Sequence, residues 1–238
     1  MYNLTFEFSI EKLVRSIAFF SKQGVPDLTK LKIIKLLYFA DKHHLLLHGK
    51  PIIGDAYFCM EWGPVPSYSL NEINAALSKP EVPLLENSDV NLFSKLLNIK
   101  KHFYQNHPRF EAKEEEYSTS VFTQSELNSL AHTARVYGRK TAKELVDLTH
   151  QEPTWVIPNQ GRKQGSNTPI TYDLFFEGAP EQSRRILGKL VAEQFGVAIP
   201  LAGDAEYAAF ANEMATHDLT PDELTDSDVR SKSPYSRV

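Results

Sequence analysis

Residues 31–41 read Leu-Lys-Ile-Ile-Lys-Leu-Leu-Tyr-Phe-Ala-Asp and lie in the longest apolar region of the chain. The helical pattern around them predicts one helix from a cap at Asp27 to His48, with Gly49 as a left-handed terminator and Pro51 just beyond. Its apolar residues cover more than one stripe, which is typical of a helix packed on several sides. We therefore expect this helix to be the centre of the core.

The segments next to this helix supply its first packing partners. Ser9 is a good N-cap for a helix through Gln23, where apolar residues recur at helical spacing. After the central helix, Ile52 to Trp62 has a strand-like pattern bounded by Gly63 and Pro64. These patterns predict a second buried helix and a small β-hairpin or paired strand.

The remaining sequence is read mostly as shorter helices. The Thr123–Glu126 pair forms a capping box that opens one of them. The predicted helices are 67–77, 89–97, 123–137, 141–150, 181–195 and 204–215. An irregular strand pair is expected within 100–117, a mobile loop within 158–169, and a disordered tail from Thr216.

The predicted fold class is mainly α. It consists of a compact helical domain around a central buried helix, a small β-hairpin or short sheet, and a C-terminal helical annex. The expected domain organisation is 1–178 for the main domain, 179–216 for a helical extension and 217–238 for the tail.

Composition favours an ordinary globular protein of the cytoplasm. Of the 238 residues 42% are hydrophobic, which is ample for a core. The single cysteine, Cys59, excludes an intramolecular disulfide and an all-cysteine metal cluster. The first eight residues do not resemble a signal peptide, and charged residues interrupt the apolar region from Ile33 to Leu47. No membrane segment is therefore expected.

The charge balance argues against strong DNA binding. Formal net charge is −4, so the whole molecule has no positive field that would attract nucleic acid. Two modest basic surfaces are predicted on helices, one from Arg184, Arg185 and Lys189, the other from Arg135, Arg139 and Lys140. Neither is interleaved with aromatic residues that could stack on bases.

Histidines on the central helix are the first candidates for chemistry. His44 and His48 are one helical turn apart and Asp41 lies one turn earlier, a spacing that could present metal ligands. Leu45 stands where a zinc-protease helix would have glutamate. Structural histidines are the interpretation we favour, and a metal-dependent enzyme using His43, His44 or His48 is the alternative.

Other catalytic patterns were not found in the sequence. Cys59 lies in an apolar alternating run, where a thiol is usually a small buried hydrophobic group. The acids Glu114, Glu115 and Glu116 are consecutive and cannot face one another as an acid–base pair. Motifs for nucleotide binding and for serine hydrolases are absent. We expect no catalytic centre and no cofactor.

The segment Trp62-Gly63-Pro64-Val65-Pro66 is unusual because two prolines fix its backbone while Gly63 permits positive φ. It is interpreted as a rigid corner. In one interpretation Trp62 packs on the core and the corner only redirects the chain. In the other it is a protein-binding knuckle with Trp62 as the anchor.

Three blocks of residues resemble the Panacea domain, also called the SocA-like antitoxin domain, of bacterial and phage toxin–antitoxin pairs. The first is Leu31–Asp41 followed by His44-Leu45 and Gly49-Lys50-Pro51, and the second is the corner Trp62–Pro66. The third is Tyr137-Gly138, Leu145, Thr149-His150, Trp155 and Ile170-Thr171-Tyr172. Together the blocks span about residues 9–178.

The resemblance implies an antitoxin that neutralises a toxin, encoded beside it, by direct protein binding. It carries over no catalytic residues. A proteolytic adaptor that delivers the toxin to a protease is an alternative. We expect partner contacts at Trp62, Gly63, Pro64, Val65, Arg184 and Arg185. The annex from Glu181 to Ala215 and the tail are expected to wrap or specify the partner.

Overall fold

The computed structural model describes residues 4–78, 90–102 and 105–196. The chain divides into two compact units, Met1–Leu190 and Val191–Val238. The predicted helix at 204–215 and the predicted tail lie outside the described residues. The domain boundaries at 178 and 216 remain predictions.

Helices make up most of this unit, as predicted. They are α1 (Ile10–Lys22), α2 (Lys30–His48), α3 (Ser67–Ser78), α4 (Val90–Leu96), α5 (Gln124–Tyr137), α6 (Ala142–Thr149), α7 (Pro153–Asn159), the 3-10 helix η1 (Tyr172–Phe176) and α8 (Glu181–Phe195). The last of these continues a few residues into the second unit.

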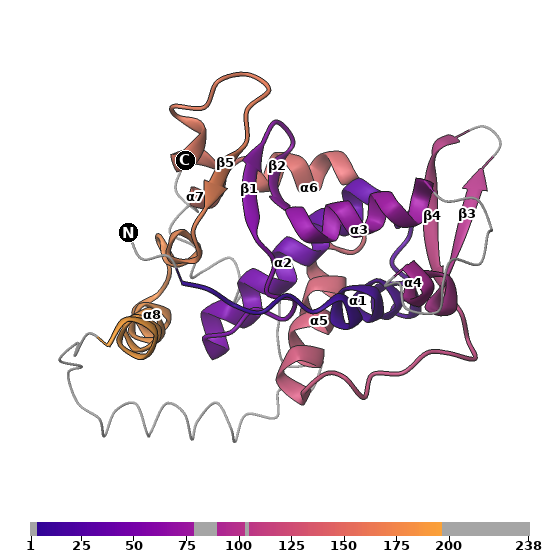
Figure 1. Cartoon of the computed structure of the whole chain (residues 1–238), viewed down its shortest axis with the longest axis horizontal. Coiled ribbons are helices and arrows are strands. Elements are labelled where there is room, and N and C mark those ends of the chain that lie inside the picture. The colour runs from indigo at the N-terminus through magenta and orange to yellow at the C-terminus, as the bar shows by residue number, and fades with distance from the viewer. Residues whose placement is uncertain (1–3, 79–89, 103–104, 197–238) are drawn as a thin grey trace. The chain divides into compact units, whose positions relative to one another are not determined.

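Two small antiparallel sheets, well separated in Figure 1, complete the fold. One has the strand order β2-β1-β5, and the other is the pair β3-β4. The strands are β1 (Tyr57–Met60), β2 (Gly63–Pro66), β3 (Leu97–His102), β4 (Gln105–Ala112) and β5 (Thr168–Ile170). The predicted strand pair within 100–117 is thus present, beginning slightly earlier.

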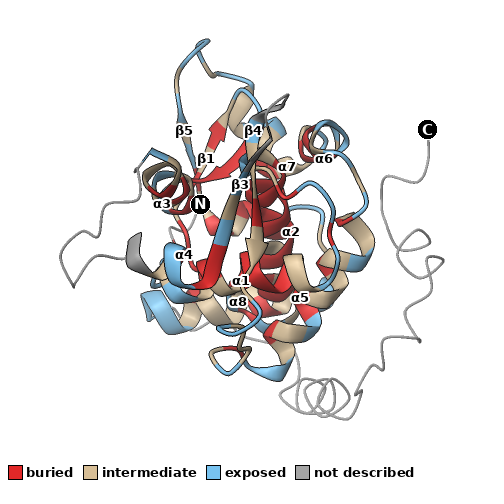
Figure 2. Ribbon diagram, turned by 90° about the vertical axis from the view of Figure 1, so that its right-hand side faces the viewer, coloured by how far each residue is buried: buried red, intermediate tan, exposed pale blue. Residues whose placement is uncertain are grey.

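The centre of the unit is α2, which Figure 2 shows as a largely buried helix among the other elements. Its contacts include α5, β2, α6 and α3. The terminator Gly49 is left-handed, with φ of 72°, as predicted. The predicted start is wrong: Asp27 lies outside the helix with φ of 54°, and Thr29 is the N-cap. An N-cap residue has extended backbone angles, which Asp27 with its positive φ does not have, so Thr29 is the cap and α2 begins at Lys30.

Helix α1 begins as predicted, because the Ser9 side chain accepts a hydrogen bond from the backbone N–H of Lys12. Helix α3 begins at the predicted Ser67, but the carboxylate of Asp55 supplies its cap. That carboxylate accepts from the backbone N–H groups of Tyr68 and Ser69 at 2.9 and 2.8 Å. A cap from a distant segment leaves no local sequence pattern.

The predicted corner at Trp62–Pro66 is wrong. Gly63–Pro66 forms strand β2, paired in register with β1 from Tyr57↔Pro66 to Met60↔Gly63. Because β2 is the edge strand, Pro64 and Pro66 can lack donors there without breaking the sheet. The chain therefore reverses between β1 and β2, at Glu61 and Trp62, and the hairpin lies about four residues further along the chain than the Ile52–Trp62 pattern predicted.

In the second half of the unit, the predicted start of α5 is confirmed and one helix, α7, was not predicted. Thr123 and Glu126 form both bonds of the predicted capping box, and Thr141 with Glu144 forms a second box at the start of α6. Helix α7 occupies residues expected to be turn and loop. Pro153 suits the first position of a helix, where its missing N–H costs nothing. The loop between α7 and β5 is thus shorter than the predicted 158–169, and its mobility stays a prediction.

None of the described helices is both long and apolar enough to cross a bilayer.

A candidate partner-binding hairpin

The β1–β2 hairpin rests on a buried lysine of the central helix. Lys35 is fully buried, and its Nζ donates to the backbone oxygen of Pro64 at 2.9 Å. Burial lowers the pKa of Lys35 to about 7, an effect that the nearby Cys59 thiol opposes. Within the described part of the chain no carboxylate forms an ion pair with this ammonium group. The lysine therefore supports β2 through a buried hydrogen bond to its backbone.

Gly63 allows the hairpin to sit this close. Its φ is +97°, and a Cβ at this position would lie 2.6 Å from Lys35 Nζ and 2.5 Å from Thr149 Oγ1. Thr149 is itself buried at the end of α6, where its hydroxyl donates to the Val146 carbonyl at 2.9 Å. Both backbone conformation and lack of space require glycine here.

Helix α7 holds β1 and the end of α6 from another side. The indole Nε1–H of Trp155 donates to the Met60 carbonyl at 2.9 Å, and its ring stacks on His150 with 4.0 Å between centroids. The Cys59 thiol donates to the Trp155 carbonyl at 3.6 Å. Tyr38 and Thr154 add a buried hydroxyl pair at 2.6 Å between α2 and α7. The hairpin is therefore fixed to the core by side chains of two helices, Lys35 of α2 and Trp155 of α7.

Trp62 points to solvent at the turn of this hairpin, with 59% of its surface exposed. The interpretation that Trp62 packs on the core is therefore wrong, because the chain reverses at this residue and carries the indole outward. Gly63, Pro64 and Val65 lie in the strand and are buried. Among the four predicted contact residues from Trp62 to Val65, Trp62 is thus the one with a large exposed side chain.

The adjoining helix also exposes apolar side chains. Val156 and Ile157 of α7 are 38% and 39% exposed, and α7 packs against both β1 and β2. A large aromatic residue on a supported turn, beside a helix with exposed aliphatic groups, is the composition of an interface anchor. Tyr68 of α3 is another exposed aromatic residue, but its ring packs against Phe8.

The two other predicted contact residues lie on α8. Arg184 and Arg185 both form ion pairs with Glu181, at 2.9 and 3.8 Å. Their side chains are 60% and 37% exposed. Surface pairs of this kind stabilise a helix only slightly, so the guanidinium groups can exchange Glu181 for another acid. Their role in partner binding stays a prediction.

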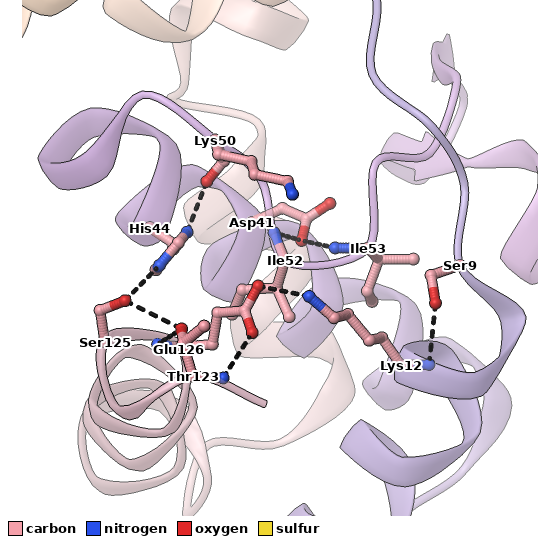
Figure 3. A network of polar contacts seen from close by, with 10 residues as sticks. All are labelled: Ser9, Lys12, Asp41, His44, Lys50, Ile52, Ile53, Thr123, Ser125 and Glu126. Atoms are coloured by element: carbon pink, nitrogen blue, oxygen red, sulfur yellow. Dashed lines mark hydrogen bonds and ion pairs between the residues drawn. The ribbon is translucent and has the colours of Figure 1, made fainter. Parts of the chain in front are cut away.

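Polar side chains inside the unit form hydrogen bonds that hold its segments together. The buried Asp41 carboxylate accepts from the backbone N–H groups of Ile52 and Ile53, each at 2.9 Å, and from the Tyr57 hydroxyl at 3.0 Å. Burial raises the pKa of Asp41 to about 7 even though these hydrogen bonds oppose the shift. Asp41 therefore fixes the chain that leads from α2 to the hairpin (Figure 3).

The histidines of α2 have similar structural partners. His44 contacts the Lys50 carbonyl through Nδ1 and the Ser125 hydroxyl through Nε2, as Figure 3 shows. His43 contacts the Ser129 hydroxyl at 3.0 Å and stacks on His132. Burial lowers the pKa of His44 to about 4 and that of His43 to about 3, so both rings are neutral.

Figure 3 also shows how α1 and α5 are joined. Lys12 of α1 forms an ion pair with Glu126 at 2.6 Å, and the same glutamate accepts from the Thr123 backbone N–H in the capping box. The residues described here contain no group of three or more histidine, cysteine, aspartate or glutamate side chains that could hold a metal ion. The clustered polar groups thus connect helices to one another.

Several supporting residues were not recognised from the sequence. Lys35, Thr149 and Trp155 belong to the blocks that resemble the family, but the sequence alone assigns none of them to the hairpin. One signal in the sequence could have identified Lys35. A lysine in the middle of an apolar helix that packs on several sides is buried, and a buried lysine needs a hydrogen-bond acceptor.

Comparison with known proteins gives one match. The sequence model of the family "Antitoxin SocA-like, Panacea domain" matches residues 33–156, slightly more than half of the chain. These residues run from α2 through the hairpin to α7. No curated protein and no solved structure matches the chain.

Proposed function

This chain belongs to the SocA-like antitoxin family with the Panacea domain, and from that premise we propose that it is an antitoxin acting by direct protein–protein binding. Its partner would be a toxin encoded by a neighbouring gene. The single observation that carries the proposal is the family match, because the matched residues include the central helix, the hairpin and its supports. The proposed protein acts in the cytoplasm and has no catalytic step of its own.

Trp62 is the proposed anchor for the toxin. Its backbone is held by the β1–β2 pairing, and the strand that follows is bonded to Lys35. Little conformational entropy is lost when a side chain on a supported turn is buried in an interface. Exposed tryptophans in such positions commonly account for a large share of the binding energy. Val156 and Ile157 would extend the apolar contact.

The arginines of α8 are proposed as a second, polar contact. Arg184 and Arg185 would pair with acidic groups of the toxin and set specificity more than affinity. The segment from Glu181 onward remains the proposed specificity element. Truncation after Gly178 would remove α8, whose Ile186 lies only 3.0 Å from the place where a Gly49 Cβ would stand, and would therefore also disturb α2. Truncation after Gly196 keeps α8 and therefore tests only the residues that follow it.

The test is co-expression with the product of the neighbouring gene. We expect the wild-type chain to restore growth that the toxin arrests and to co-elute with it as a stoichiometric complex after purification. A toxin that is rescued only in cells with an intact protease, and that does not co-elute, would support the proteolytic adaptor instead. Absence of both rescue and complex formation with this neighbour would contradict the proposal.

A further inference from the structure

A pocket with a cationic lining lies away from the hairpin, where three segments of the first unit meet. Its volume is about 380 Å³, and it is lined by the α1–α2 connection, by β4 and by the α5–α6 turn. Four basic side chains contribute to the lining: Lys32, Arg109, Arg139 and Lys140. Only Arg139 and Lys140 are neighbours in the sequence, so folding gathers the remaining charges.

Two of these cations are held in place. Arg109 Nη2 forms an ion pair with Asp27 Oδ1 at 2.8 Å, and Phe110 N–H donates to the Leu28 carbonyl at 3.0 Å, which fixes β4 to the α1–α2 connection. Lys32 is buried, and its Nζ donates to the Pro26 carbonyl at 2.7 Å. A lysine ammonium has three N–H donors, so Lys32 retains capacity for another acceptor.

The acids near the pocket do not balance this charge. Asp27 lines it and is occupied by Arg109. Glu144 acts electrostatically on Lys32, but its carboxylate accepts from the N–H and hydroxyl of Thr141 in the α6 capping box. Burial lowers the pKa of Lys32, and these two acids only partly oppose the shift. A bound anion would offset the cost of holding the ammonium group there.

We infer that this pocket binds a small molecule carrying phosphate groups. Arginine and lysine together recognise phosphate oxygens, with arginine giving directional pairs and lysine a point charge. Small-molecule sites usually measure roughly 300–1,000 Å³, so the pocket suits a nucleotide or another polyphosphate. The hydroxyls of Thr29 and Thr141 and the His107 ring add polar groups to the lining. This inference is independent of the proposed antitoxin activity.

Isothermal titration calorimetry of the full chain tests the inference with orthophosphate, pyrophosphate, ATP and adenosine. We expect pyrophosphate and ATP to bind more tightly than orthophosphate and adenosine not to bind, with affinity falling as salt is raised. The double variant Arg139→Gln/Lys140→Gln should weaken pyrophosphate and ATP binding about tenfold or more. These two residues lie at the α5–α6 turn, outside the core, so the variant should fold.

The matched control is Lys143→Gln/Lys163→Gln, which removes the same charge from two exposed lysines that do not line the pocket. It should leave affinity within about twofold. Equal loss in both double variants would overturn the inference, since it would indicate a net-charge effect. No heat from pyrophosphate or ATP at millimolar concentration would also overturn it. So would tight binding of a duplex DNA probe together with none of pyrophosphate or ATP.

Discussion

The interior of α2 and the tip of the β1–β2 hairpin lie close together in the sequence but use their side chains differently. On α2, polar residues stand at every third position from Lys32 to His44, and each bonds a residue outside the helix. At the tip, Trp62 is exposed at the turn of a firmly held hairpin. The polar residues of α2 thus bond the scaffold, while the candidate functional residue is an exposed tryptophan.

Helical geometry explains the difference. A step of three residues advances roughly 300° around an α-helix, so successive members of such a series point to directions about 60° apart. The series from Lys32 to His44 therefore winds around α2 and reaches neighbours on several sides. The five side chains accordingly do not all converge on one point but bond partners at several places around the helix.

The largest stability effect is expected at Asp41. Asp41→Ala removes the acceptor for two backbone N–H groups and the Tyr57 hydroxyl, so unfolding free energy should fall by roughly 3–5 kcal/mol. Urea denaturation followed by circular dichroism measures this change. The exposed Asp147 offers a control, because Asp147→Ala should cost less than about 0.5 kcal/mol. Similar losses in both variants would contradict the structural role assigned to Asp41.

Gly63 comes next. Gly63→Ala forces a Cβ onto a residue with φ of +97° and against Lys35 and Thr149, so a loss of about 2–4 kcal/mol is expected from strain and overpacking. Gly165 has φ of +78° with open space around it, and Gly165→Ala should cost only about 1 kcal/mol. Thermal or urea denaturation of the Gly63→Ala and Gly165→Ala variants measures both losses. Their difference gives the cost of crowding, because both residues have positive φ. Equal losses would mean that the close approach to Lys35 is unimportant.

A smaller, pH-dependent effect should come from Lys35. The folded state releases this proton near pH 7, whereas the unfolded chain keeps it to about 10.5, so the folded state binds fewer protons between these values. Relative to Lys35→Met, the wild-type unfolding free energy should therefore rise with pH, by about 2 kcal/mol between about pH 7.5 and 9.5. Urea titrations at several pH values give this difference.

The control for this profile is Lys163→Met on the exposed loop, which should change stability equally at each pH. A flat difference between wild type and Lys35→Met would show that Lys35 keeps its proton in the folded state throughout this range.

Local signals predicted a large part of the fold. Ser9, Gly49 and the Thr123–Glu126 box are contacts between residues close in sequence, and each was located correctly. The start of α2 was misplaced because Asp27 is a common cap, whereas its left-handed φ accompanies an ion pair with the distant Arg109. Helix α7 was missed because its prolines suggested a loop.

The candidate site was less predictable, for a physical reason. Two prolines and a glycine in five residues indicate a turn, and only the pairing with β1 and the bond from Lys35 make this segment a strand. Whether Trp62 faced the core or solvent depended on the residue at which the chain reversed. Tertiary contacts determine where the chain reverses, and these contacts cannot be inferred from a single sequence.

The smallest stability effect should accompany the largest functional effect, at Trp62. The direct test is the affinity of purified Trp62→Ala for the toxin, measured by titration calorimetry beside Tyr68→Ala, another exposed aromatic residue. We predict that Trp62→Ala weakens binding by at least about 30-fold while stability changes by less than about 0.5 kcal/mol, and that Tyr68→Ala leaves affinity within about threefold. Wild-type affinity in a stably folded Trp62→Ala variant would contradict the claim that the hairpin tip binds the partner.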